Sequence, residues 1–318
     1  MTTKMMKMPT TRKKLTKTRI DLLLYLLCSL IWGSTWLAIK FQIDSVSPLV
    51  GVFYRFVLAS SILFLLHLFL KKTLRYRKAN HQIFFFQGIC NFSMNYILTY
   101  QAEKYATSAV IALVYTTMIH FNILGLRIFF KKKIHKNVVY GSFIGILGVF
   151  FLFYEDISKF NGDPKSLMGV GIGLVAVFFA SAGNMFSHQN HVMKVPVMAA
   201  NAWGMFYGTI FTGILCLVFS QIFSLPAHAS FWGTLIYLSL FGTVIAFGAY
   251  SYLVGKIGAE RAVYTTLVSP VIAVLLSSFF ENLKVTSFLL LGITFCLLGN
   301  ILTLFYSGRS AKVLDATP

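Results

Sequence analysis

Residues 22–41 read LLLYLLCSLIWGSTWLAIKF, twenty positions with a single charged side chain, that of Lys40. About 20 apolar residues in a helix are what it takes to cross the hydrocarbon core of a bilayer. A basic tail precedes this run, as in a secretory leader, but the run is long enough to span and no small-x-small cleavage site ends it. We therefore predict an uncleaved first membrane span.

The same pattern recurs along the chain. Ten spans are predicted, at residues 21–41, 47–70, 82–101, 105–130, 137–154, 168–189, 197–220, 230–253, 259–280 and 286–306. Backbone groups in lipid find no water, so each span must be a helix or part of a closed barrel. Continuous apolar runs exclude the barrel, whose strands alternate. The predicted fold class is an all-α integral membrane protein with ten transmembrane helices.

Composition supports this class. The chain of 318 residues is 57% hydrophobic and 12% charged, about half the charged share of a soluble domain. Its net charge of +19 is gathered in short basic runs between the spans, at Lys4–Arg19, Lys71–Lys78 and Arg127–Lys136. That layout is typical of cytoplasmic loops facing anionic lipid, so the predicted partner is the bilayer and not nucleic acid.

Loop charges also predict the orientation. The tails and alternate loops on one side hold 22 Lys and Arg, whereas the other side holds five Lys. The positive-inside rule places the richer side, with both termini, in the cytoplasm. We expect a multi-pass protein of a bacterial-type inner membrane.

The two halves of the chain resemble each other. Tyr100-Gln-Ala-Glu-Lys-Tyr-Ala recurs loosely as Tyr252-Leu-Val-Gly-Lys-Ile-Gly, about 152 residues later, unless the likeness is a coincidence of apolar composition. Five spans per copy would insert the second copy upside down, as in many secondary transporters. The predicted organisation is a basic cytoplasmic tail (1–20), a first repeat (21–154), an extracytoplasmic loop (155–167), a second repeat (168–306) and a cytoplasmic tail (307–318).

Three stretches resemble the drug/metabolite transporter superfamily, in particular its EamA-type, ten-helix branch. They are Leu30-Ile-Trp-Gly-Ser-Thr-Trp36, Phe53-Tyr-Arg-Phe56, and the segment from Gly258-Ala-Glu-Arg-Ala262 to Ser269-Pro270. The resemblance implies a carrier of small metabolites, often an exporter. The family usually has a proline in span four as well, where this chain has Met118. We therefore expect span four to be straighter than span nine.

Polar and aromatic side chains within the spans are the candidate binding residues, because such groups are costly in lipid and need a reason to be there. Helix–helix hydrogen bonding is the alternative to a central cavity. The predicted substrate-binding residues are Trp32, Thr35, Trp36, Asn91, Asn95, Tyr115, His120, Asn184, His188, Trp203, Tyr207, Tyr264 and Ser269.

Charged groups inside the spans are few. Arg55 is the one Lys or Arg well inside a predicted span, and it either reaches the outer interface or binds a substrate carboxylate. No Asp or Glu lies deep in a predicted span, so a carboxylate proton relay has no obvious members. His120 and His188 are the candidates for proton coupling, or else neutral hydrogen-bond partners.

These features predict a secondary transporter for a small neutral or zwitterionic metabolite such as an amino acid, working by alternating access. A cationic or nucleobase-like metabolite stacked on the tryptophans is the alternative substrate. A membrane-embedded enzyme would need a metal triad, a Ser/His/Asp set or paired carboxylates near the spans. A non-transporting receptor would need a larger extramembrane domain. No Walker-type loop is present. We expect no enzymatic activity, catalytic residue, metal or cofactor.

Two glycine pairs, Gly141-x3-Gly145 and Gly204-x3-Gly208, allow close helix contact. The contact could form within one chain or between two, so the sequence leaves a homodimer open.

Overall fold

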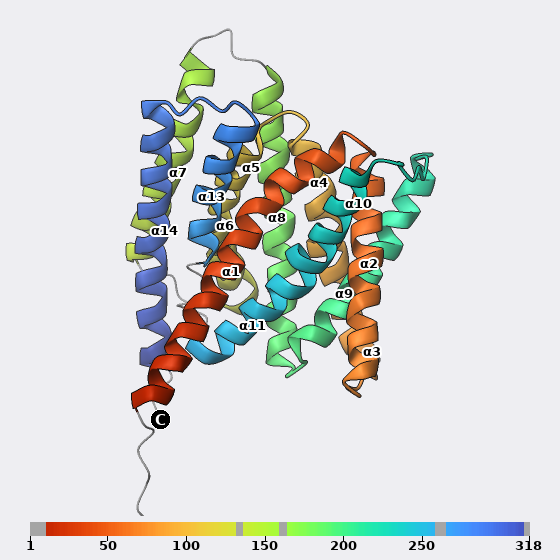
Figure 1. Cartoon of the computed structure of the whole chain (residues 1–318). Helices are drawn as coiled ribbons and strands as arrows, with labels where there is room; N and C mark the ends of the chain where they lie inside the picture. Colours follow the sequence, from red (N-terminus) through yellow and green to blue (C-terminus); the bar gives the residue numbers. More distant parts are fainter. Residues whose placement is uncertain (1–10, 132–135, 159–163, 258–264, 315–318) are drawn as a thin grey trace, which may run out of the picture.

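The computed structural model describes residues 11–131, 136–158, 164–257 and 265–314, and these form helices joined by turns, with no strand (Figure 1). The first half contains five spans. They are α1 (Thr11–Ile43); α2 (Pro48–Phe69); α3 (Lys78–Gln87), η1 (Gly88–Met94) and α4 (Asn95–Ala102); α5 (Ser108–Val114), η2 (Tyr115–Thr117) and α6 (Met118–Phe130); and α7 (Lys136–Ser158).

The second half repeats the arrangement with five more. They are α8 (Pro164–Val192); α9 (Val197–Val218); α10 (Ala229–Ile236), η3 (Tyr237–Ile245) and α11 (Ala246–Ile257); α13 (Thr265–Phe280); and α14 (Ser287–Leu314). The prediction of an all-α membrane fold is confirmed. Six of the described spans are long and apolar enough to cross a membrane by length and composition, and α7, α13 and α14 contain shorter apolar helices.

Several helices run past the predicted span ends. Helix α1 begins at Thr11, inside the predicted tail, and α7 continues to Ser158. A helix satisfies its own backbone hydrogen bonds in water as well as in lipid, so the bilayer edge does not end it. The predicted start of span nine, at residues 259–264, lies outside the described residues.

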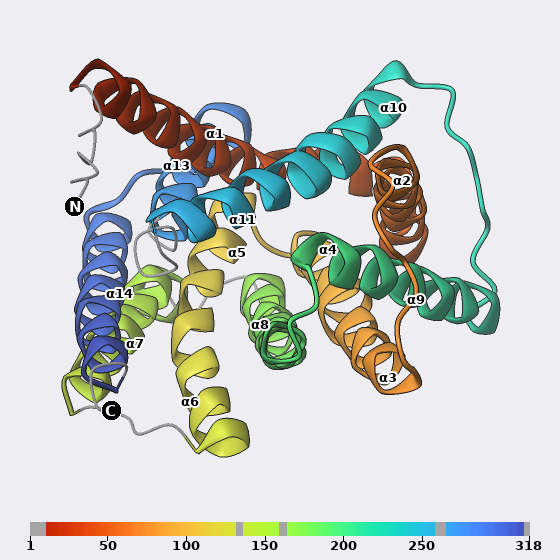
Figure 2. The same cartoon turned by 90° about the horizontal axis from the view of Figure 1, so that it is seen from below.

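The packing of the helices follows the repeat. Span two packs on span seven (α2 on α9) and span five on span ten (α7 on α14), so equivalent spans meet each other. Span one contacts spans eight and nine, and the equivalent span six contacts spans three and four. Figure 2, seen from below, shows α7 beside α14 at one end of the molecule and α2 beside α9 at the other. A two-fold relation between the halves produces this pattern, because each contact made by a span of one half has an equivalent made by the matching span of the other half.

Backbone irregularities also occur at equivalent places. Span three contains the π-helical segment η1, and span eight contains the π-helical segment η3. π-Helical turns are rare and frequently lie at functional sites. In span four, the 3₁₀ turn η2 ends directly before Met118, whereas α13 continues as an α-helix through Pro270. Span four is thus irregular without a proline, and the expectation that it is the straighter of the two stays a prediction.

Glycines let the helices approach closely within this chain. A Cβ on Gly299 of α14 would lie 2.4 Å from the backbone nitrogen of Gly145, and one on Gly88 would lie 2.4 Å from the backbone oxygen of Gly204. Both glycine pairs noted in the sequence thus serve contacts between spans of one chain. A homodimer stays a prediction.

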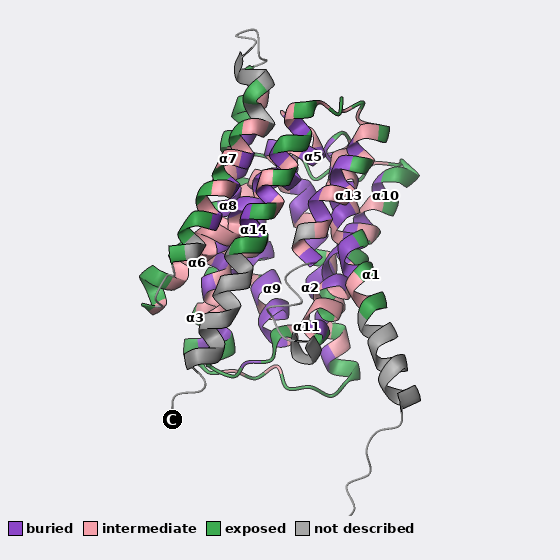
Figure 3. Cartoon of the chain, turned by 90° about the vertical axis from the view of Figure 1, so that its left-hand side faces the viewer, coloured by how far each residue is buried: buried purple, intermediate pink, exposed green. Residues whose placement is uncertain are grey.

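Burial separates the interior from the outer surface (Figure 3). Phe56, Phe92, Tyr100 and Met205 are buried between the halves. Large apolar side chains cover the outer faces instead, among them Phe143, Ile146 and Phe150 on α7 and Ile210, Ile214 and Leu217 on α9. An exposed apolar surface of this kind requires lipid around it.

Candidate functional site: a polar pocket between the two halves

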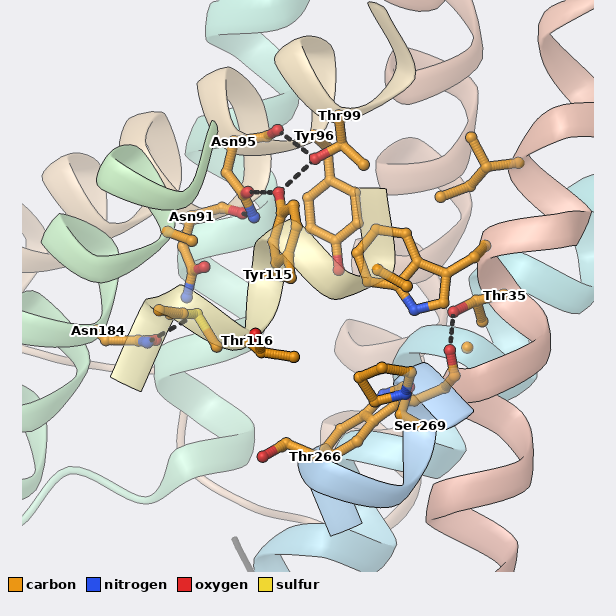
Figure 4. Close-up of a pocket in the computed structure, with 18 of the residues that line it drawn as sticks. Thr35, Asn91, Asn95, Tyr96, Thr99, Tyr115, Thr116, Asn184, Thr266 and Ser269 are labelled. Carbon is orange, nitrogen blue, oxygen red and sulfur yellow. Dashed lines mark hydrogen bonds between the residues drawn. The ribbon is translucent and has the colours of Figure 1, made fainter. Parts of the chain in front are cut away.

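A cavity of about 320 Å³ lies between the two halves (Figure 4). Spans one to four of the first half line it, together with spans six, eight, nine and ten of the second. Its lining extends from Thr99, near the end of α4, to Thr266, near the start of α13. The π-helical segments contribute Asn91 and Gly242.

One wall of the pocket is polar and comes from spans three, four and six. The Tyr115 hydroxyl donates to Oδ1 of Asn95, and the Thr99 hydroxyl donates to the Asn95 backbone oxygen (2.7 Å). Lower in the pocket, Nδ2 of Asn184 donates to Oδ1 of Asn122 (3.2 Å). The predicted polar stripes thus meet across three spans, with hydrogen bonds between them.

A second wall, which adjoins the first at Tyr115, is aromatic and centres on span one. The Trp36 ring packs against Tyr115 with 4.8 Å between centroids, in an edge-on arrangement. Trp32 contacts Tyr250 (5.2 Å) and Phe247 (5.7 Å) on span eight. These rings offer an apolar, quadrupolar surface to a flat or aliphatic group.

Arg55 lies at the pocket and is only 1% exposed, so it does not reach the outer interface. Its nitrogens donate to neutral partners over long distances: to Oγ1 of Thr243 (3.3 and 3.4 Å) and to the Tyr100 hydroxyl (3.5 Å). The Tyr96 ring lies 4.5 Å from the guanidinium carbon. In the described part of the chain, no carboxylate forms an ion pair with it.

Asn300 of α14 also lines the pocket, with 1% of its side chain exposed. Both its amide nitrogen and its amide oxygen are buried, and neither has a hydrogen-bond partner in the described part of the chain. A buried amide left unpaired costs about 1–3 kcal/mol, so such groups call for an explanation. A ligand in the pocket would supply the missing partners.

The pocket brings together most of the residues selected from the sequence. Those that line it are Trp32, Thr35, Trp36, Asn91, Asn95, Tyr115, Asn184 and Ser269, along with Arg55. That they bind substrate stays a prediction. Tyr264 lies outside the described residues.

Four predicted residues do not line this pocket, and we leave them out of the candidate site. Trp203 donates to the backbone oxygen of Leu74 (3.2 Å), and the Tyr207 hydroxyl lies 3.0 Å from Nδ1 of His81. His120 lies against Gly145, where an added Cβ would come within 2.8 Å of its ring, and His188 packs edge-on against Phe130. Each faces a neighbouring helix, because one helix has several buried faces in a ten-span bundle.

Other lining residues were not among the predicted ones. Tyr96, Phe247 and Asn300 are the clearest cases. An aromatic ring in an apolar span carries no signal that separates a pocket from packing. Asn300 stands out in the sequence as an amide within an apolar span. Nothing in the sequence shows, however, whether its amide is hydrogen-bonded to another helix, as the other asparagines could be.

Two five-span repeats of opposite direction enclosing a polar cavity define the class of protein: a multi-pass membrane protein built like a secondary transporter. Comparison with known families is more specific. The model of the EamA-like transporter family matches residues 19–154 and again residues 167–305, so the chain belongs to that family. The family resemblance is thereby confirmed.

Several curated relatives are named as uncharacterized transporters. An uncharacterized transporter of Buchnera aphidicola subsp. Schlechtendalia chinensis is 27% identical over 82% of this chain and 84% of its own. The transporter YoaV of Bacillus subtilis is 25% identical over 88% and 95%, and the inner membrane transporter YedA of Escherichia coli K12 is 27% identical over 83% and 84%. A solved crystal structure shares the fold, with a TM-score of 0.65 at 16% identity over 92% of this chain and 98% of the other.

Proposed function

We propose that this transporter carries a small zwitterionic metabolite with an apolar side chain, an amino acid or a close analogue. The observation that carries the proposal is Arg55, a buried cation at the pocket whose described partners are neutral. A guanidinium binds a carboxylate through charge-assisted, often bidentate, hydrogen bonds. A substrate carboxylate would therefore compensate the buried charge.

The remaining walls suit the rest of such a molecule. Asparagine oxygens and tryptophan or tyrosine faces accept an ammonium group without a full countercharge. The pocket volume of about 320 Å³ lies at the small end of ligand sites and fits a metabolite of a few to a dozen heavy atoms. Among the described lining residues Arg55 is the one cation, so polyanions such as sugar phosphates are not favoured.

A cationic or nucleobase-like metabolite is the second candidate, and the aromatic wall around Trp32 favours it. The buried Arg55 charge opposes a cation, because like charges repel strongly where water is excluded. We therefore rank the amino acid first.

Transport would proceed by alternating access, with the two halves rocking about the pocket. The irregular segments η1, η2 and η3 and Pro270 lie in spans that line the pocket, and such segments bend more easily than regular helix. We further propose that the protein resides in an inner membrane with both termini in the cytoplasm, and that it performs no covalent chemistry. YedA, the related inner membrane transporter, supports the location.

The proposal is tested by measuring ligand binding and ligand transport with the purified protein. Thermal-shift screening against amino acids and against nucleobases would identify a ligand, and uptake into proteoliposomes would measure its transport. Arg55→Gln should weaken carboxylate binding by roughly 10- to 100-fold, since a hydrogen bond to a charged group contributes about 1.5–3 kcal/mol. Arg55→Lys keeps the positive charge but loses the forked set of N–H donors. Its affinity for the carboxylate should therefore lie between those of wild type and Arg55→Gln.

The methyl ester of the preferred amino acid is a matched control for the carboxylate. The ester should bind wild-type protein as weakly as the parent amino acid binds the Arg55→Gln variant, and the variant should not distinguish the two. An ester that binds wild-type protein at full affinity would contradict the role of Arg55. A nucleobase as the only ligand would favour the second candidate.

A further inference from the structure

A buried polar cluster lies beyond the pocket, at the end that the loop charges place outside the cell. Glu103 occupies the turn after α4 and is completely buried. Ser108 begins α5, Glu281 follows α13, and Lys40 lies near the end of α1. The cluster therefore ties spans one, three, four and nine together, and so connects the two halves above the pocket.

The two carboxyl groups meet at Ser108. Glu281 accepts hydrogen bonds from the Ser108 backbone nitrogen (3.1 and 3.2 Å) and from the Ser277 hydroxyl. Oε2 of Glu103 lies 3.3 Å from the Ser108 hydroxyl, and its other oxygen, Oε1, is buried with no hydrogen-bond partner. Lys40 donates to the backbone oxygen of Glu103 (2.7 Å).

The Ser108 hydroxyl shows which form of Glu103 fits. Its oxygen lies 3.2 Å from the backbone oxygen of Trp36 and 3.3 Å from the Glu103 carboxyl, but a hydroxyl carries one proton. An ionised Glu103 must compete with Trp36 for that proton. A protonated Glu103 instead donates its own proton to the hydroxyl oxygen, which leaves the hydroxyl proton for Trp36 and satisfies both contacts.

Electrostatics agree with this geometry. Burial raises the pKa of Glu103 well above its usual value and the charge of Glu281 raises it further, whereas Lys40, the hydrogen bond with the Ser108 hydroxyl and Arg55 oppose the rise. The phenols of Tyr100 and Tyr115 also interact with Glu103. Two neighbouring carboxylates in a buried site do not both ionise readily.

We propose that Glu103 is a proton-binding site that holds the outer end of the pocket closed. When the proton is bound to Glu103, the contacts of Ser108 and Trp36 keep spans one, three, four and nine joined. Loss of the proton places a second negative charge beside Glu281 and breaks the shared hydroxyl contact. The cluster then separates, and water reaches the pocket from outside. This proposal rests on the proposed transport function in one respect: only for a transporter does opening give a substrate access to the pocket.

The direction of the pH effect follows from linkage. A carboxyl group whose pKa is higher in the closed state than in the open, hydrated state binds protons preferentially in the closed state. Closure is therefore favoured at low pH and lost as the pH rises through the raised pKa. Opening toward the outside should increase with pH.

The experiment needs no substrate. Thr99→Cys places a reporter thiol at the pocket lining near the cluster, in a background with Cys28, Cys90, Cys216 and Cys296 replaced. Right-side-out vesicles are labelled with a membrane-impermeant maleimide across about pH 5 to 9, and each rate is divided by that of the same reporter carrying Glu103→Gln. The division cancels the titration of the thiol itself. We expect the ratio to rise by about tenfold or more, because one pKa unit between two states is a tenfold change in their equilibrium.

Glu281→Gln is the second variant, and it keeps the test open if Glu103→Gln fails to fold. Removing the neighbouring charge should move the midpoint of labelling to lower pH without abolishing it. A ratio that stays flat overturns the proposal, and so does a midpoint that is unchanged in Glu281→Gln. Inside-out vesicles separate the two hypotheses: labelling there that does not fall as outside labelling rises would refute alternating access, while the proton-dependent gate stands.

Discussion

Asn300 poses the clearest question at the scale of single residues. Its amide lines the pocket, is buried and has no protein partner. A group of this kind destabilises the empty protein and gains a partner only when a ligand binds. Stability and function should therefore move in opposite directions when it is removed.

Asn300→Leu is expected to leave the melting temperature of the empty protein unchanged or to raise it, and to weaken binding or flux of the substrate. Thermal unfolding in detergent and uptake into proteoliposomes would measure the two effects. The free energy of unfolding should increase by up to about 1–3 kcal/mol, which is the cost of an unpaired buried amide.

Asn201→Leu is the matched control. Oδ1 of Asn201 accepts a hydrogen bond from Nε2 of Gln87 (3.3 Å), and Gln87 in turn accepts one from Asn190 (2.7 Å). Breaking this buried network should lower the melting temperature, by about 0.6 kcal/mol or more for an average membrane hydrogen bond. Equal destabilisation by both substitutions would show that Asn300 is paired after all.

At the scale of elements, the π-helical segment η1 begins at a glycine that packs closely on α9. A Cβ at Gly88 would lie 2.4 Å from the oxygen of Gly204 and 2.8 Å from the nitrogen of Gly208, both backbone atoms of α9. Backbone cannot rotate out of the way as a side chain can, so span three would have to move away from span seven.

Gly88→Ala should therefore destabilise the protein by about 1–3 kcal/mol, the usual cost of overpacking, and lower its melting temperature. Gly233→Ala, in α10, is the control: no atom lies within 4 Å of its added Cβ. Alanine is the better helix former, so that variant should be as stable as wild type or slightly more stable. A Gly88→Ala variant that melts at the wild-type temperature would contradict the close approach.

At the scale of the whole molecule, the inverted halves fix which loops share a side. Lys72, in the loop between α2 and α3, and Ser224, in the loop between α9 and α10, lie at opposite ends of the bundle and are exposed. With the basic loops in the cytoplasm, the two positions face opposite compartments.

Single cysteines at these positions test the orientation. Lys72→Cys should react with an impermeant maleimide only in inside-out vesicles, and Ser224→Cys only in right-side-out vesicles, each in the cysteine-free background. Labelling of both from one side would mean that an even number of spans separates them in the membrane. The reverse pattern would place the termini outside.

Much of the architecture followed from local properties of the chain. Length and polarity of the apolar runs locate the spans, since each run must satisfy its backbone internally in lipid, and Lys and Arg counts indicate the sides. The irregular turns did not follow: η2 arises in span four without a proline, and η1 begins at Gly88, where the backbone of α9 lies close. A close contact of this kind joins residues far apart in sequence.

What the sequence by itself determined was a ten-span, two-repeat membrane fold and a set of polar side chains inside it. Which of them share a cavity was decided only by the tertiary structure, because the rotation of each helix about its own axis is set by packing. His120 and Trp203 thus face neighbouring helices, whereas Asn300 lines the pocket. Glu103 is the sharpest case: a turn residue in sequence, it is completely buried, and Lys40 of span one donates to its backbone oxygen.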